Sequence, residues 1–308
     1  MGRKKIAVIG AGKVGATLVQ ILAYKQLGDI VLWNRTVDKA QGIALDILES
    51  APVEGFDVKI KATGELADIK DSDVVVITAG IPRKEGMSRD DLLAVNAALI
   101  SSFTEGIKTY APNAVLVVVT NPLDAMVYLT MKKTGFQKNR VIGMAGILDS
   151  ARLREFIAME TGASVKDITT LVLGSHGDTM VPLVRHTRIG GVPIEDIVPK
   201  EKITAMVERT RNGGAEIIKL EKDSSAYYAP ASSLALIVES ILLDKKMVLP
   251  CSAYVEGEYG INGIFMGVPV VVGAGGIEKI VQLNLNDDEK RDLAASAEKI
   301  RALVSQMK

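Results

Sequence analysis

Short apolar runs rich in β-branched residues alternate with segments of helical spacing through the first half of the chain. The apolar runs predict buried strands, and they occupy residues 5–10, 29–33, 57–60, 73–80, 114–120 and 140–144. Segments with helical spacing lie between them, at residues 13–26, 37–49, 89–110 and 123–134. Nearly continuous apolar strands joined by helices indicate a parallel sheet covered on both faces, because parallel strands require crossover connections. The first half is therefore predicted to be a doubly wound α/β domain.

The pattern changes near residue 145. A predicted helix at 147–161 precedes short strands, two long helices, further strands and a charged terminal helix, at residues 169–173, 179–189, 200–220, 224–243, 247–256, 264–272, 277–283 and from Asp287 onward. This mixture predicts an α+β fold. We expect a first domain at residues 1–144 and a second at 145–308. Since no linker or repeat separates them, they should form one compact body with two lobes.

The composition is that of an ordinary globular protein and argues against several classes of partner. Charged residues make up 24% and hydrophobic residues 48% of the 308 residues. Lys and Arg together number 37, as do Asp and Glu, so no net field draws the protein to nucleic acid or to an anionic membrane. The uncharged stretch 259–277 has the length of a membrane span, but its glycines, Pro269 and Asn262 favour two buried strands with turns.

The single cysteine, Cys251, lies in the apolar run MVLPCSAYV, which predicts a buried, inert thiol in a reducing compartment. The apolar run near the N-terminus is interrupted by Gly10, Gly12, Lys13 and Gly15, unlike a secretion signal. Together these features predict a cytoplasmic protein. Two distant histidines and one cysteine offer no ligand cluster, so no metal site is expected.

The first strand leads into a glycine-rich turn that directly precedes a helix. In a GxGxxG turn the first glycine permits the tight bend, the second lets a pyrophosphate approach the backbone, and the third lets the helix pack on the strand. The helix N-terminus then stabilises the negative charge. Because the flanking strands and helix are all present, we expect a Rossmann-type dinucleotide-binding domain, with the cofactor at Gly10, Gly12, Lys13, Val14 and Gly15.

The residue that closes the second strand indicates which dinucleotide is bound. An Asp or Glu there accepts from the ribose 2′-hydroxyl of NAD, whereas a nearby Arg accommodates the 2′-phosphate of NADP. In this chain Asn34, Arg35 and Thr36 follow Trp33, so none of these three positions has a carboxylate. The pattern favours NADP(H), with NAD(H) as the alternative, because Arg35 also suits a solvated loop position.

One of the 2 histidines stands in a pattern typical of a reactive side chain. His176 lies in the segment GSHGD, residues 174–178, just after an apolar strand. A glycine-flanked ring at a strand end is open to a ligand and titrates near neutral pH. His186 lies in a polar strand pattern and is expected at the surface, while Asp149 begins a helix, where carboxylates are common for structural reasons alone.

Five ordered motifs resemble those of the lactate/malate dehydrogenase family. They are GAGKVG, AGIPRKEGMSRDDL, VTNPLDAM, GILDSARLR and GSHGDTMVPL, and their order and spacing match the family over almost the whole chain. The resemblance implies that His176 is the proton acceptor and that Asp149 orients its ring and stabilises the imidazolium. It also implies that Arg152 holds the carboxylate common to all 2-hydroxy acids, a task that suits a planar guanidinium.

The same resemblance assigns ligand contacts in the first half of the chain. Arg89 corresponds to the arginine that polarises the substrate carbonyl when the loop at roughly 80–90 closes. Asn121 corresponds to a contact with the substrate and the nicotinamide ribose. Asn96 and the backbone around Val119 correspond to further cofactor contacts.

The prediction of substrate depends on Arg83. At this position lactate dehydrogenases resembling this chain carry Gln and malate dehydrogenases carry Arg, because a second substrate carboxylate needs a counter-charge. The resemblance therefore implies interconversion of malate and oxaloacetate. The alternatives are a lactate or other 2-hydroxyacid dehydrogenase and a non-catalytic dinucleotide-binding redox sensor. A sensor, however, needs neither a proton acceptor nor a carboxylate clamp.

The expected partners are a small-molecule substrate and further copies of the chain. The resemblance implies a homodimer or homotetramer. The apolar helical patterns at 13–26 and 224–243 suit either subunit contacts or the core of the chain itself.

Overall fold

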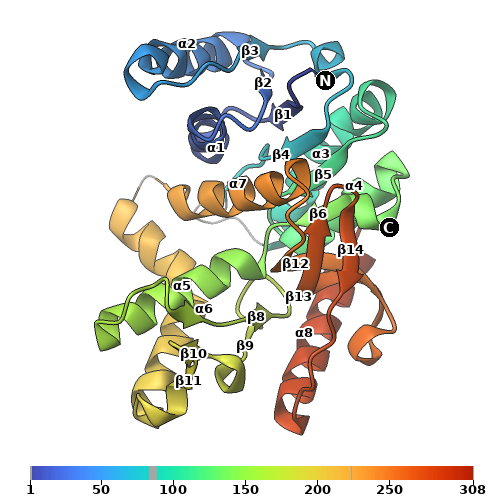
Figure 1. The fold of residues 1–308 in the computed structure, drawn as a ribbon. Helices are drawn as coiled ribbons and strands as arrows, with labels where there is room; N and C mark the ends of the chain where they lie inside the picture. The colour runs from blue at the N-terminus through green and yellow to red at the C-terminus, as the bar shows by residue number, and fades with distance from the viewer. Residues whose placement is uncertain (1, 83–88, 223, 308) are drawn as a thin grey trace.

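The computed structural model describes residues 2–82, 89–222 and 224–307. Its first half contributes parallel strands to one large sheet (Figure 1), namely β1 (Lys5–Ile9), β2 (Asp29–Trp33), β3 (Ile60–Thr63), β4 (Val74–Ile77), β5 (Val115–Val118) and β6 (Val141–Gly143). The chain order reverses beside β1, which lies between β2 and β4. The doubly wound parallel sheet predicted from the apolar runs is thus confirmed. Ligands of such sheets bind at the carboxyl ends of the strands beside this reversal.

Strands from the second half extend the same sheet. They are β12 (Met247–Glu256), β13 (Asn262–Gly273) and β14 (Gly276–Ile280), which pair antiparallel with one another. Ser252 of β12 stands opposite Gly143 of β6, so the described strands form one sheet in the order β14-β13-β12-β6-β5-β4-β1-β2-β3. The two halves of the sequence therefore share a backbone hydrogen-bonded core.

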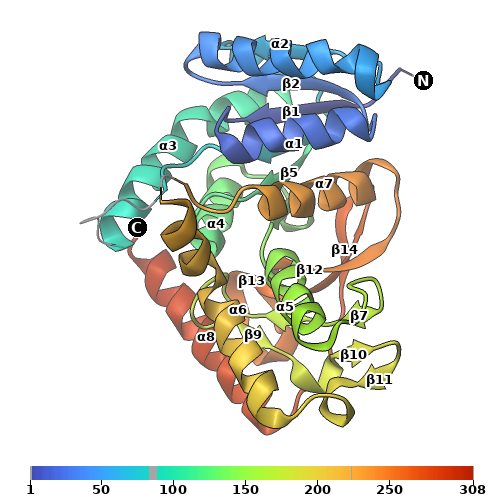
Figure 2. The ribbon, with the colours of Figure 1, turned by 90° about the vertical axis from the view of Figure 1, so that its left-hand side faces the viewer.

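Helices cover both faces of the parallel strands because strand side chains alternate between the faces. Ile6 and Val8 of β1 pack on the face covered by α1 (Lys13–Tyr24), α2 (Val37–Glu54) and α7 (Tyr228–Leu242). Ala7 and Ile9 pack on the other face, which is covered by α3 (Arg89–Tyr110) and α4 (Leu123–Thr134). Figures 1 and 2 both show α7, from the second half, beside α1.

The rest of the second half forms the lower lobe in Figures 1 and 2. Its helices are α5 (Gly146–Thr161), α6 (Lys200–Glu221) and α8 (Asp287–Ser305). Its short strands are β7 (Ile168–Thr169), β8 (Val172–Leu173), β9 (Val181–Pro182), β10 (Arg188–Ile189) and β11 (Val192–Pro193). Five single 3-10 turns complete the described elements: η1 (Leu66–Ile69), η2 (Lys138–Arg140), η3 (Val184–His186), η4 (Ile194–Asp196) and η5 (Glu258–Gly260).

Several predicted boundaries differ from the structure. The strand expected at 57–60 begins only at Ile60, because pairing with β2 starts where Ile60 meets Ile30. The helix expected at 37–49 continues to Glu54 and includes Pro52 in its last turn. The strand expected at 169–173 is divided between two small sheets, since β7 pairs with β10 and β8 with β9. No helix within the described ranges has both the length and the apolar character needed to cross a membrane.

Candidate active site

The glycine-rich turn has the shape that a dinucleotide requires. Gly10 has φ of +116°, and a Cβ atom added at Gly15 would overlap the carbonyl oxygen of Gly10, so the bend and the close helix packing both depend on glycine. A Cβ at Gly12 would meet no heavy atom within 4 Å. Open space therefore lies above Gly12, where α1 begins at Lys13 and its first N–H groups lack helical partners. This space suits a pyrophosphate.

The end of β2 leaves two polar side chains available at the expected ribose position. The Asn34 side chain is engaged internally, since its Oδ1 accepts from the Ala11 N–H at 3.2 Å and its Nδ2 donates to the Thr36 carbonyl at 2.8 Å. Arg35 and Thr36 are exposed, and neither side chain has a hydrogen-bond or ion-pair partner in the part of the chain that the structure describes. An anionic group at this strand end would therefore meet an unpaired guanidinium.

Side chains at the carboxyl ends of β1, β4 and β5 join these strand ends together. The Thr78 hydroxyl donates to the Gly10 carbonyl at 3.0 Å, and the Thr120 hydroxyl donates to the Ala79 carbonyl at 2.7 Å. Asn96 is fully buried on α3, and its amide donates to the Asn121 carbonyl at 2.7 Å.

Of the predicted ligand contacts in this region, Asn121 presents an exposed side chain and Val119 is half-buried. Asn96, by contrast, uses its amide within the protein, because its Oδ1 also accepts from the Ile81 N–H at 2.8 Å. In the structure, the Asn96 side chain connects the turn after β4 to the turn after β5 by hydrogen bonds.

The structure brings His176 to Asp149 and Arg152, which lie one turn apart on α5 and 24 or more residues before His176 in the sequence. His176 Nδ1 lies 2.8 Å from Asp149 Oδ2, and Arg152 Nη1 lies 3.3 Å from Asp149 Oδ1. The Asp149 side chain is 1% exposed, whereas those of His176 and Arg152 retain 15% and 14% exposure. A buried carboxylate therefore holds a histidine ring and a guanidinium side by side, each with part of its surface open to a ligand.

Burial and charge act in opposite directions on the pKa of His176. Burial lowers the pKa, but the charge and hydrogen bond of Asp149 raise it further than burial lowers it, and the Arg152 cation opposes Asp149. The pKa of His176 is consequently raised above its ordinary value. A ring in this environment holds a proton more firmly than a free imidazole.

The turn that carries His176 is attached to the main sheet on one side and to α8 on the other. Gly174, with φ of +82°, exchanges two backbone hydrogen bonds of 2.9 Å with Gly267 of β13. The Ser175 N–H donates to the Ser296 hydroxyl of α8 at 2.8 Å. Sequence reasoning did not identify Ser296, because a serine in the middle of a helix carries no functional signal.

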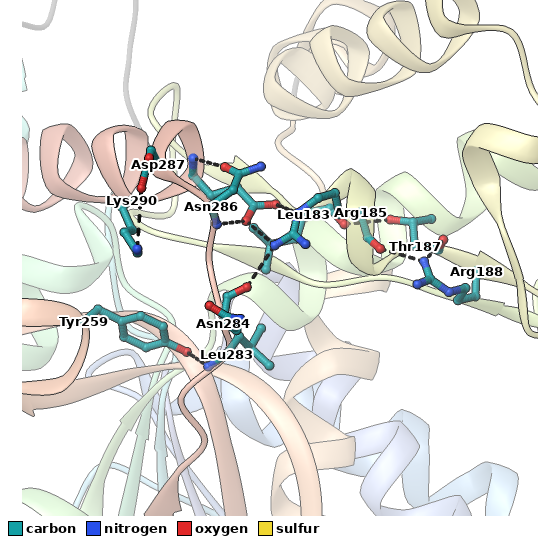
Figure 3. Close-up of polar contacts among 11 residues, drawn as sticks. Leu183, Arg185, Thr187, Arg188, Tyr259, Leu283, Asn284, Asn286, Asp287 and Lys290 are labelled. Atoms are coloured by element: carbon teal, nitrogen blue, oxygen red, sulfur yellow. Dashed lines mark hydrogen bonds and ion pairs between the residues drawn. The ribbon is translucent and has the colours of Figure 1, made fainter.

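The N-terminus of α8 is in turn held by the η3 turn (Figure 3). Arg185 Nη2 donates to Glu289 at 2.9 Å and to the Asn284 carbonyl at 2.9 Å, and Asn286 caps the helix. His186, expected at the surface, is instead half-buried, and its Nε2 is buried with no hydrogen-bond partner among the described residues. The ring is less exposed than expected because the η3 turn directs it inward, whereas Arg185 on the same turn stays exposed.

A further carboxylate, which sequence reasoning missed, touches the His176 turn. Asp124 in the first turn of α4 is 5% exposed; its Oδ2 accepts from the His176 N–H at 3.3 Å and its Oδ1 accepts from the Ser252 hydroxyl at 2.6 Å. Burial raises the pKa of Asp124 to about 6. Its only sequence signal is its place in the VTNPLDAM motif, since an acid in a first helical turn is common.

Two predicted residues fall outside these contacts. Arg83 lies outside the described residues, and so does the side chain of Arg89, whose backbone begins α3.

The described part of the chain contains no group of three His, Cys, Asp or Glu side chains placed to hold a metal ion.

Comparison with known proteins extends the likeness over the full length. Two family models match: lactate/malate dehydrogenase, NAD binding domain, over residues 4–143, and lactate/malate dehydrogenase, alpha/beta C-terminal domain, over residues 147–308. The malate dehydrogenase of Anoxybacillus flavithermus is 55% identical over 303 residues, which cover 98% of this chain and 97% of that protein.

Solved structures of relatives have the same fold. The malate dehydrogenase of Picrophilus torridus in its apo form is 47% identical, with a TM-score of 0.96 over 99% of this chain and 97% of that one. The lactate dehydrogenase of Cryptosporidium parvum, solved with lactic acid and β-nicotinamide adenine dinucleotide, is 40% identical, with a TM-score of 0.96 over 99% of this chain and 98% of that one. The chain belongs to the lactate/malate dehydrogenase family.

Proposed function

We propose that the protein interconverts malate and oxaloacetate, with a nicotinamide dinucleotide as the carrier of the hydride. The observation that carries this proposal is the buried Asp149, which holds His176 and Arg152 side by side at 2.8 and 3.3 Å. Relatives named malate dehydrogenase, 52–55% identical over nearly the full chain, support the choice of substrate. We assign residues 1–144 to a dinucleotide-binding domain and residues 145–308 to a substrate and catalytic domain, with the first domain also contributing substrate contacts.

His176 is the proton acceptor in malate oxidation and the proton donor in the reverse reaction. Because Nδ1 faces Asp149, Nε2 is the ring atom left for the substrate hydroxyl. A base positioned in this way contributes on the order of 10²–10⁴-fold to the rate. The raised pKa of His176 follows from its contact with Asp149 and favours the imidazolium that forms as the hydroxyl proton leaves.

Arg152 binds the substrate carboxylate that is adjacent to the reacting carbon. Its guanidinium is partly exposed and is oriented by Asp149 from behind, so its remaining N–H groups can form a bidentate pair. When Arg152 holds the substrate carboxylate, the neighbouring substrate hydroxyl lies near His176, because His176 contacts the other oxygen of the same Asp149 carboxylate. One buried carboxylate thus sets the relative position of the base and the substrate clamp.

The open space at Gly12 and the exposed Asn121 side chain fit the dinucleotide, whose nicotinamide ring, when bound, accepts or supplies the hydride. Arg83 and Arg89 complete the proposal from the family resemblance. Arg83 pairs with the second carboxylate of malate, and Arg89 polarises the carbonyl of oxaloacetate.

We further propose that NADP(H) is preferred over NAD(H). None of the three residues that directly follow β2 is a carboxylate that could accept from a ribose 2′-hydroxyl or repel a 2′-phosphate. The exposed Arg35 and Thr36 side chains can bind that phosphate by charge-assisted hydrogen bonds. Solvent and salt weaken such a contact. The preference should be about ten- to a hundredfold, or about 1.4–2.8 kcal/mol.

Steady-state kinetics test both proposals. Oxaloacetate and pyruvate are each offered with NADH and with NADPH, and the loss of reduced cofactor is followed by absorbance. The proposal expects oxaloacetate to be the better substrate and His176→Ala to lose most of kcat while still binding cofactor. Better turnover of pyruvate would favour a lactate dehydrogenase, and cofactor binding without turnover of either acid would favour a redox sensor.

The cofactor preference has its own variant. Arg35→Ala should reduce kcat/KM for NADPH by about tenfold and leave that for NADH nearly unchanged, because only NADPH carries the phosphate. Arg291→Ala, which removes an exposed cation on α8, is the matched control. A clear NADH preference in the unmodified protein contradicts the proposal.

We also expect the protein to form a homodimer or homotetramer. Light scattering can measure this oligomeric state.

A further inference from the structure

Asp124 lies where three separate parts of the fold meet beside the proposed active site. It is in the first turn of α4, three residues after Asn121, and it is 5% exposed. Its Oδ1 accepts from the Ser252 hydroxyl of β12 at 2.6 Å, and its Oδ2 accepts from the His176 N–H at 3.3 Å. This single carboxylate therefore connects α4, the extended sheet and the turn that carries the base.

These contacts determine where His176 stands relative to Asn121. The Asp124 side chain is held by Ser252, which in turn stands opposite Gly143 in the sheet. Because the His176 backbone is hydrogen-bonded to this held carboxylate, the turn cannot move away from the N-terminus of α4 without leaving a buried acceptor short of a partner. A lost partner of this kind is costly in a buried site.

The charges around His176 come from three helices and from the turn itself. Helix α5 contributes Asp149 and Arg152, α4 contributes Asp124, and Lys299 of α8 pairs at 2.9 Å with Asp178 of the same turn. Asp149 and Asp124 both favour the imidazolium, while Arg152 opposes it. Asp124 is the member of this group that contacts the His176 backbone rather than its ring.

We propose that Asp124 is a positioning residue of the reaction: it holds the His176 turn against the N-terminus of α4 and, as a second carboxylate beside Asp149, stabilises the protonated ring. This inference rests on the proposed role of His176. It assigns a function to the buried pair of Asp124 and Ser252 that a helix-capping role alone would not explain, because capping requires neither the charge nor the hydroxyl from β12.

The test is the pKa of His176 in Asp124→Asn, measured by NMR on the full-length protein with histidine labelled in the ring. The chain has only 2 histidines, so His186 provides an internal reference, and His186→Gln assigns the signals. Asparagine keeps the shape and can still accept from the His176 N–H, but it removes the charge. The pKa of His176 should fall by about one unit, the lower end of the range for a nearby charge.

The kinetic consequence has a defined sign. Reduction of oxaloacetate needs a protonated His176, so the alkaline limb of kcat/KM should move to lower pH by the same unit, and activity above the pKa should fall about tenfold. Ser240→Ala removes another buried hydroxyl, which donates to the Val272 carbonyl at 2.8 Å, and serves as the matched control. It should leave the pKa of His176 unchanged.

Ser252→Ala is the second variant, in case Asp124→Asn does not fold. The Ser252 hydrogen bond lowers the pKa of Asp124, so its loss leaves more Asp124 protonated and should lower the pKa of His176 by a smaller amount in the same direction. An unshifted pKa of His176 in these variants, or a loss of kcat that is uniform with pH, overturns the proposal. Failure of the unmodified enzyme to act on oxaloacetate would instead reject the proposed function, because the NMR titration does not depend on turnover.

Discussion

Replacing Asp149 by asparagine tests the central contact of the proposed site. Asp149 is 1% exposed and binds two partners, His176 at 2.8 Å and Arg152 at 3.3 Å. Asparagine has almost the same shape but no charge. If its amide N–H faces Nδ1, the ring proton must move to Nε2, where it prevents the ring from accepting the substrate proton.

The size of the effect follows from the contact that is lost. A hydrogen bond to a charged group contributes about 1.5–3 kcal/mol. At about 1.36 kcal/mol per pKa unit, the pKa of His176 should fall by roughly one to two units. The sign is fixed because the carboxylate favours the charged ring and asparagine does not. At a pH above that pKa, kcat/KM for oxaloacetate should therefore fall roughly ten- to 150-fold.

The assay is the pH profile of kcat/KM for both directions of the reaction. The value of kcat/KM for oxaloacetate reduction should fall first at alkaline pH. The value for malate oxidation should fall further if the ring tautomer changes. Asp196→Asn, at an exposed position on η4, is the control for the loss of one carboxylate and should behave like the unmodified enzyme. A variant at position 149 with an unshifted profile and near-normal kcat would falsify the assignment of Asp149 as the partner of the base.

Three further outcomes are expected. Arg83→Gln should reduce kcat/KM for oxaloacetate by at least about tenfold and improve pyruvate relative to it; an unchanged ratio in steady-state assays would mean that the second carboxylate is bound elsewhere. Gly15→Ala should cost about 1–3 kcal/mol in chemical denaturation because its Cβ overlaps the Gly10 carbonyl, whereas Gly12→Ala should fold normally and bind cofactor more weakly by calorimetry; equal stabilities would contradict the packing argument. The thiol of Cys251, whose pKa burial raises to about 12, should resist alkylation in the native protein and react only on unfolding, as mass spectrometry would detect.

Local patterns in the sequence were sufficient to predict most of the elements. The starts of α1, α3 and α4, and the strand β2, agree with the ranges predicted from spacing, because side-chain periodicity and flanking turn residues act within a few positions of one another. The GxGxxG turn could likewise be predicted, since the bend, the open backbone and the helix start are all encoded within six residues. The motifs selected His176, Asp149 and Arg152, and the structure places their side chains in contact. Their roles remain predictions, as do those of Arg83 and the Arg89 side chain, which lie outside the described residues.

Other features depend on segments that are distant in the sequence. Strand β12 extends the sheet of the first half, and α7 covers one of its faces. Both elements come from residues more than a hundred positions away, so local side-chain periodicity cannot predict these contacts. Ser296 and Asp124 belong to ordinary helical patterns, and only the folded chain places one against Ser175 and the other against His176. The half-buried His186 shows the same effect. Its polar neighbours in the sequence predict a surface position, and only the contact between η3 and α8 in the folded chain shows otherwise.

By itself, then, the sequence determined the parallel sheet, the dinucleotide turn and the residue types for acid–base chemistry, because each depends on side chains a few positions apart. Tertiary structure decided the distances within the site and the charges around His176. Those distances arise where α4, α5, α8 and β12 converge, and electrostatic effects depend on separation in space rather than along the chain.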